Sequence, residues 1–383
     1  MSRTPAGDVD RPNFVRCVFV LLVVNSRNMF DSVRLPERSD AATYTTARRV
    51  DNPTRVRYHL ISTMKKSRIM RRLLLAALLI PGVACSQNTT MPGEIVPDTL
   101  LSSRLIDIVH ALGLDSTFDV GEDGTEQISL AVIDLNTHPA RLGGVHPDNF
   151  IYPASVYKMY VAASVLKQIS DGRLSLWDPF VVRSPNDVDR SRELADDPRP
   201  LLHDGDTVTV NYLLDLMITR SDNSAANCMI DLARRENINA MIRDFGWNGS
   251  EVTRKFLRRK FEDPGYDTVR GTETCALHAA EFMYRVYTNQ LVNPWVSQQM
   301  KSFLGRQLDT SKLYAGLPRD AMFYHKTGWF AYWTNDVGIV EGTTRYIVAC
   351  FVPLTEGIAL PKMRELSRRI YEMMIRAKSR GAY

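Results

Sequence analysis

Length, composition and charge narrow the classes to which this chain can belong. The 383 residues are 44% hydrophobic, which is enough for a sizeable core, and they fit one domain of about 250 to 300 residues with a leader. Residues 1–85 hold 15 of the 48 Lys and Arg residues but only 6 of the 43 Asp and Glu residues, so they carry +9 and residues 86–383 carry −4. The part that can fold is mildly acidic and has no basic helix, which excludes nucleic acid as a partner.

The stretch from Met64 to Cys85, "MKKSRIMRRLLLAALLIPGVAC", has the order of a secretory signal peptide. A basic segment precedes a run of mostly apolar residues that is too short for a stable membrane span, and small residues stand before the cysteine. The pattern predicts export to the periplasm. Two alternatives stay open: lipidation at Cys85, which makes the protein a membrane-anchored lipoprotein, and plain cleavage, because Gly82 stands where the lipoprotein pattern usually has a larger aliphatic residue.

The signal also sets the domain boundaries. A signal peptide works from the N-terminus, so residues 1–63 are interpreted as a misassigned or disordered leader. Residues 64–85 form the signal peptide, and the polar residues 86–97, with two prolines, form a tether. The folded domain is expected over residues 98–378.

The mature chain alternates between helical and strand patterns. Apolar spacing predicts helices over residues 98–112, 155–169, 210–219, 223–235, 274–288 and 361–376. Runs rich in β-branched and aromatic residues predict strands over residues 127–135, 141–145, 322–330, 335–342 and 345–354. This order favours an α+β (mixed α/β) fold, in which an antiparallel sheet is covered by the first and last helices and an all-helical subdomain lies beyond it. A cleft is expected between two such lobes.

Cysteines and histidines are few and scattered. Cys228, Cys275 and Cys350 remain outside the leader, an odd number without a Cys-x-x-Cys pattern, so little or no disulfide bonding is expected. The seven histidines form no His-Glu-x-x-His or similar cluster. Neither a metal nor another cofactor is expected.

Ser-x-x-Lys, a weak pattern by itself, occurs three times, at Ser62, Ser155 and Ser164. The last two are nine residues apart in one predicted helix, and at about 100° per residue they lie on opposite faces. Ser155 is the better candidate because it follows "YPA" at the helix start, where free N–H groups favour a developing negative charge. A serine needs a neighbouring base to become a nucleophile, and Lys158, one turn along, can serve. The alternative is a helix cap beside a solvated lysine.

Two further segments favour Ser155 as a nucleophile over the interpretation as a helix cap. "TRSDNSAANCMIDL" places Ser221 and Asn223 where one helix gives way to the next, and "FYHKTGWF" places Lys326, Thr327 and Gly328 inside a strand. Each alone is most often a helix cap or a strand end. Together, on helix start, loop and strand, they reproduce the signature of penicillin-recognising serine enzymes. The chain therefore resembles the class A β-lactamase family over about residues 98–378, and the resemblance implies a β-lactamase/transpeptidase-like fold.

The resemblance also implies roles for these residues. Ser155 would attack the carbonyl of a β-lactam or cell-wall peptide, and Lys158 would take its proton directly or through a relay. Ser221 would pass a proton to the leaving nitrogen. The remaining residues would bind the substrate: Asn223 its amide side chain, Lys326 and Thr327 its carboxylate, and the backbone N–H groups of Ser155 and Trp329, which follows Gly328, its oxyanion. We expect a monomer that acts on a small molecule.

One position departs from the family pattern. Class A enzymes carry a glutamate between the second and third motifs that activates the deacylating water, and the count along "VTRKFLRRKFEDPGYDTVRGTETC" reaches Arg259 there. An arginine stays protonated and cannot act as a general base at neutral pH. Glu262 is a nearby substitute if the loop is reshaped, but a solvated carboxylate is its more ordinary interpretation. Slow β-lactamase, D,D-peptidase-like enzyme, covalent binding protein and hydrolase of another ester or amide all stay open.

Overall fold

The computed structural model describes residues 94–189, 197–257 and 271–379. All of them belong to one unit of the chain, Ala84–Tyr383. The predictions for residues 1–63 and 64–85, and for Arg259 and Glu262, lie outside the described residues. Among the described helices, none has the length and apolar character that crossing a membrane requires.

A six-stranded sheet forms the centre, in the order β1-β5-β4-β10-β9-β8. The strands, in chain order, are β1 (Ile95–Pro97), β4 (Ser129–Asp134), β5 (Ala140–Val145), β8 (Met322–Phe330), β9 (Trp333–Glu341) and β10 (Arg345–Val352). All neighbours are antiparallel except β1 and β5, which run parallel. Alternate residues face opposite sides, so the sheet supplies two cores.

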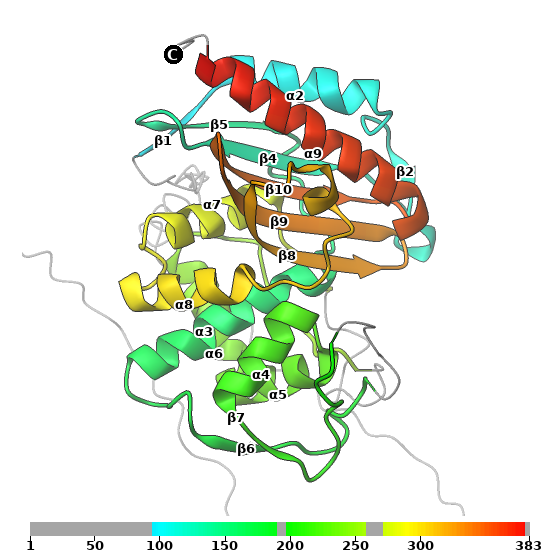
Figure 1. The fold of residues 1–383 in the computed structure, drawn as a ribbon. Coiled ribbons are helices and arrows are strands. Elements are labelled where there is room, and N and C mark those ends of the chain that lie inside the picture. The colour runs from blue at the N-terminus through cyan, green and yellow to red at the C-terminus, as the bar shows by residue number, and fades with distance from the viewer. Residues whose placement is uncertain (1–93, 190–196, 258–270, 380–383) are drawn as a thin grey trace, which may run out of the picture. The chain divides into compact units, whose positions relative to one another are not determined.

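The first and last helices cover one side of the sheet (Figure 1). Helix α2 (Thr99–Ala111) begins at Asp98, whose side chain accepts a hydrogen bond from Leu101 N at 2.9 Å and caps the helix. Helix α9 (Glu356–Ser379) runs beside it. Their apolar stripes pack on the outward residues of the central strands in a buried cluster that includes Leu105, Val109, Val132, Val348, Leu366 and Ile370.

Helices also cover the opposite side and continue into a second lobe. Helices α7 (Ala276–Tyr287), α8 (Pro294–Leu304) and α3 (Lys158–Ser170) share one apolar core with the inward residues of the sheet. The same core extends to α4 (Val210–Asp215), α5 (Asn223–Ala233) and α6 (Arg235–Asp244). The nucleophile candidate therefore starts a helix that lies between the sheet and the lobe.

The predicted layers are confirmed, with local differences. A two-stranded ribbon, β6 (Pro179–Val181) with β7 (Thr207–Thr209), accompanies the lobe that was expected to be all-helical. A second ribbon pairs β2 (Phe118–Asp119) with β3 (Thr125–Glu126). The prediction of a tether over residues 86–97 was wrong at its end, because residues 95–97 form β1. Helix α9 starts five residues before the predicted Pro361, which it holds in its interior.

Candidate active site

Ser155 lies in a 3-10 turn, Ala154–Tyr157, that runs directly into α3. The preceding residue, Ala154, is buried and has φ of 47°, a left-handed conformation that is costly for a residue other than glycine. Such strain persists only where the surroundings enforce it, and here it sets the direction in which Ser155 leaves the turn. The Ser155 side chain is partly exposed and lines a cavity of about 410 Å³.

Lys158 is the first residue of α3 and is fully buried. Its Nζ donates to the carbonyl oxygen of Ser221 and to Asn223 Oδ1, both at 2.7 Å, and lies 3.4 Å from Ser221 Oγ. The amine also stands 4.1 Å above the ring of Phe256. A buried amine requires such partners, and these partners fix it against the second motif.

Ser221 lies where a helical run reverses. A π-helical turn, Leu216–Arg220, follows α4 and ends at Ser221, whose φ of 58° and ψ of 36° are left-handed. Asp222 then caps α5 by accepting from Ala225 N at 2.7 Å. The reversal turns the Ser221 hydroxyl toward β8, where the buried Lys326 donates to it at 2.9 Å.

The third motif lies on β8, against the nucleophile turn. Lys326 Nζ also donates to the carbonyl oxygen of Thr327 at 2.7 Å. A Cβ atom at Gly328 would stand 2.7 Å from Pro153 O and 2.8 Å from Ser155 N. Only a glycine lets the strand approach the turn this closely. The next residue, Trp329, is 51% exposed at the rim of the cavity.

All eight residues predicted from the three motifs therefore meet at one cavity. Six of them line it: Ser155, Ser221, Asn223, Thr327, Gly328 and Trp329. The two lysines lie behind them, in contact with the same Ser221 hydroxyl. Ser164, in the competing Ser-x-x-Lys pair, is buried in α3 and is not among the lining residues, and its partner Lys167 pairs with Asp171 at 2.9 Å on the surface.

A family model described as "Beta-lactamase enzyme family" matches residues 116–374. The chain belongs to the beta-lactamase enzyme family. A relative within it, the beta-lactamase of Streptomyces albus G, is 27% identical over 281 residues, which are 71% of this chain and 85% of that protein. The resemblance read from the three motifs is confirmed, and the chain is a β-lactamase-like hydrolase.

Solved structures agree on the fold. PBP-A aligns with a TM-score of 0.60 and 21% identity, over 74% of this chain and 98% of that one. A beta-lactamase from Sphaerobacter thermophilus DSM 20745 aligns with a TM-score of 0.59 and 19% identity, over 71% and 97% of the two chains. The beta-lactamase/transpeptidase-like fold expected from the motifs is therefore confirmed.

Several lining residues of this family member were not predicted from the sequence: Tyr152, Arg220, Phe256, Gln307, Asp309 and Glu356. Arg220 immediately precedes Ser221, so the sequence could have predicted that it lies near the site. It is buried, and its guanidinium donates to Asp222 and to the carbonyl oxygen of Arg199, both at 2.8 Å. Asp309 and Glu356 come from distant parts of the chain, and no local pattern marks them.

Charge is unevenly distributed around the cavity. The buried Lys312 donates to Asp309 Oδ2 at 2.6 Å and to Glu356 Oε1 at 3.0 Å. Burial acts to raise the pKa of Asp309, but the charge of Lys312 and hydrogen bonds from Lys312 and Ser311 hold that pKa below its usual range. Two carboxylates thus share one ammonium group at this end of the cavity.

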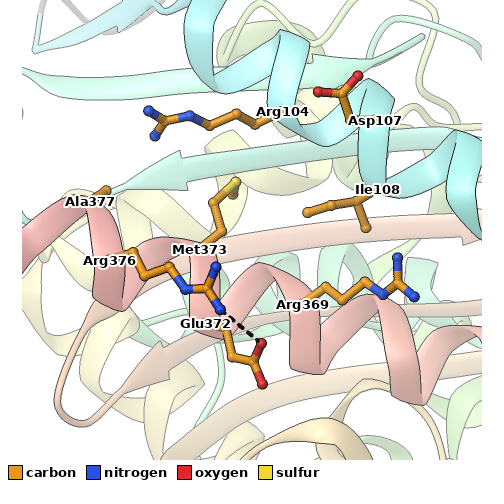
Figure 2. Close-up of a pocket in the computed structure, with 8 residues that line it drawn as sticks. All are labelled: Arg104, Asp107, Ile108, Arg369, Glu372, Met373, Arg376 and Ala377. Carbon is orange, nitrogen blue, oxygen red and sulfur yellow. Dashed lines mark ion pairs between the residues drawn. The ribbon is translucent and has the colours of Figure 1, made fainter.

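A second hollow, of about 370 Å³, lies between α2 and α9 (Figure 2). It contains none of the motif residues. The charged ends of Arg104 and Arg369 point away from one another, and Arg376 pairs with Glu372 at 3.8 Å. The residues that line this hollow include no serine, threonine, cysteine or histidine, so the cavity at Ser155 is the candidate active site.

Proposed function

We propose that this enzyme opens β-lactams through an acyl-enzyme on Ser155. The observation that carries the proposal is the position of the buried Lys158 amine, which donates to Asn223 at 2.7 Å and lies 3.4 Å from the Ser221 hydroxyl. Lys326 reaches the same hydroxyl from the other side at 2.9 Å. Lys158, Ser221 and Lys326, one group from each motif, are thus linked by hydrogen bonds beside the cavity that Ser155 lines.

The reaction follows from these contacts. Ser155 Oγ forms a bond to the lactam carbonyl carbon, and its proton passes to Lys158 in its neutral form. The carbon–nitrogen bond then breaks, and Ser221 gives its proton to the nitrogen and recovers one from Lys158. Water finally cleaves the ester, which releases the ring-opened acid and restores the Ser155 hydroxyl.

The remaining motif residues would stabilise the oxyanion and bind the substrate. Gly328 lies close to Ser155 N, and the backbone N–H groups of Ser155 and Trp329 would together stabilise the oxyanion. Loss of one such donor costs about 10²- to 10³-fold in rate in comparable enzymes. Lys326 and Thr327 would hold the substrate carboxylate, and Asn223 its amide side chain.

The names of similar proteins support this proposal. The relative from Streptomyces albus G is named a beta-lactamase. One structural neighbour, a PBP-A variant that aligns with a TM-score of 0.58, is described as an acyl-enzyme complex with penicillin G. Both descriptions concern those proteins and fit an acyl-enzyme route for this one.

A second candidate is a penicillin-binding, D,D-peptidase-like enzyme or a covalent β-lactam or cell-wall peptide binding protein with little turnover. The sequence favours it in one respect, since the count between the second and third motifs reaches Arg259 where the glutamate that activates the deacylating water is expected. Acylation uses the residues already described, so the two candidates differ in how fast the acyl group leaves.

Intact-mass spectrometry after addition of penicillin G tests both candidates. We expect one adduct on the wild type, none on Ser155→Ala, and normal labelling of Ser164→Ala, the matched serine of α3. Decay of the adduct with continued hydrolysis identifies a β-lactamase, whereas a stable single equivalent identifies a binding protein. Undiminished labelling of Ser155→Ala would refute the proposed nucleophile.

We further propose that the protein acts in the periplasm, because residues 64–85 have the order of a signal peptide. Cell fractionation tests this for the chain as written and for one that starts at Met64. Export predicts the protein in the periplasm or the membrane fraction, and Cys85→Ala releases it from the membrane if Cys85 carries a lipid. Retention of both chains in the cytoplasm would contradict the proposal.

A further inference from the structure

Four hydrogen bonds join Val188 and Asp189 to the second motif and the start of α5, and Asp189 makes three of them. Its Oδ2 accepts from the backbone N–H of Asn223 at 2.5 Å, and its Oδ1 accepts from Asn223 Nδ2 at 3.0 Å. In return, Ser224 Oγ accepts from the backbone N–H groups of Val188 and Asp189, at 2.9 Å and 3.1 Å. The loop and the start of α5 therefore hold each other in one register.

These hydrogen bonds decide which way the Asn223 amide points. A carboxylate accepts hydrogen bonds and has no hydrogen to donate, so the group that faces Asp189 must be the NH₂ of Asn223. The carbonyl end, Oδ1, then faces the opposite way and accepts from Lys158 Nζ at 2.7 Å. A reversed amide would place an NH₂ donor against the N–H groups of the Lys158 amine, where two donors repel.

We propose that Asp189 is a positioning residue of the active site: it orients the Asn223 amide so that its oxygen holds the Lys158 amine beside Ser221. The inference deepens the acyl-transfer function proposed above and rests on it for its kinetic consequences. Asp189 acts through Asn223 and touches no reacting atom in this assignment. Asp222 already caps α5 through Ala225 N, so capping leaves the side-chain contact of Asp189 unexplained.

Two substitutions of Asp189 separate orientation from simple support. Asp189→Asn keeps the shape and one acceptor. The backbone N–H of Asn223 cannot turn away and so takes that acceptor, which leaves the new NH₂ facing Asn223 Oδ1 and turns Asn223 Nδ2 toward Lys158. Asp189→Ala removes the contact, and the Lys158 amine can still hold Asn223 Oδ1 by itself. If Asp189 acts by orienting the Asn223 amide, Asp189→Asn should slow acylation more than Asp189→Ala, although Asp189→Ala removes more hydrogen bonds.

The acylation rate with penicillin G, followed by mass spectrometry, and the unfolding free energy are measured for each variant. We expect Asp189→Asn to slow acylation about 10- to 100-fold, the range for leaving a buried polar group without its hydrogen bond, and Asp189→Ala to slow it less. Asp204→Asn is the matched control, since this exposed carboxylate accepts only from Ser184 N, at 2.8 Å, among the contacts described. Equal losses, or a larger loss in Asp189→Ala, would overturn the proposal.

If Asp189→Asn fails to fold, a second comparison still tests the proposal. In an Asn223→Ala background, Asp189→Ala should have no further effect on acylation, and an undiminished additional loss would refute action through Asn223. Crystal structures of the Asp189 variants give a readout that needs no substrate: Lys158 should leave Asn223 in Asp189→Asn and stay in Asp189→Ala. If the wild type forms no adduct, the proposed function fails while these structures still decide the role of Asp189.

Discussion

Because Gly328 has no side chain, the strand that carries the third motif can pack directly against the turn that carries Ser155. A Cβ atom there would meet Pro153 O, Ser155 N and Val156 N, all of them backbone atoms that cannot rotate away. The contact therefore couples the position of β8 to that of the turn that carries Ser155. A change of one methyl group at this position must move one segment or the other.

Gly328→Ala is expected to reduce acylation sharply and to lower the unfolding free energy by about 1–3 kcal/mol, the usual cost of overpacking. Adduct formation and denaturant unfolding measure the two effects. Gly357→Ala in α9 is the matched control, because nothing lies within 4 Å of a Cβ atom there. A Gly328→Ala enzyme with normal acylation would show that the strand and the turn are not coupled.

At the scale of elements, α7 carries a buried histidine into the core beneath the sheet. His278 Nδ1 lies 2.8 Å from Ser250 Oγ, and burial lowers the pKa of His278 to about 4. In the unfolded chain a histidine titrates near 6.5. Between these values the unfolded chain binds more protons than the folded one, so stability must fall as the pH is lowered.

Between pH 7 and pH 5 this histidine should cost the wild type about 2 kcal/mol of unfolding free energy. His278→Gln removes the titrating group and should flatten that part of the pH dependence, as followed by urea unfolding at a series of pH values. His203→Gln, at an exposed position, should leave it unchanged. An equally steep loss in His278→Gln would show that other groups cause it.

The elements show how far sequence patterns reach. Runs rich in β-branched and aromatic residues predicted β4, β8, β9 and β10, residues 141–145 were predicted as the strand that is β5, and the three motifs pointed to the candidate site, because each pattern is local. Helices α6 and α8 were not predicted. The position of Asp189 beside Asn223 could not be predicted either, because it depends on how a loop packs against α5, 34 residues along the chain. Asp309 and Glu356 likewise reach the cavity only through the tertiary fold.

At the scale of the whole molecule, the two faces of the sheet separate stability from chemistry. The core under α2 and α9 contains no motif residue, whereas the core on the other face contains Val156 and Tyr157, directly after Ser155. Damage to the first core should therefore lower stability without altering the site.

Leu366→Ala in α9 tests this separation, because Leu366 is fully buried in the first core. The unfolding free energy should fall by about 2–5 kcal/mol, with an unchanged acylation rate per folded molecule at 25 °C. Ile358→Ala, at a position of the same helix that is 53% exposed, should change neither quantity appreciably. A slower acylation in folded Leu366→Ala would show that the two faces communicate.

The two terminal strands of the sheet differ in length and in the residues that they carry. The sheet order ends at the short strand β1 on one side and at β8, the long strand that carries Lys326 to Trp329, on the other. A terminal strand is a template on which another chain can build. Pairing of β8 with another chain would cover the cavity that Thr327, Gly328 and Trp329 line, so such pairing and ligand binding would exclude one another.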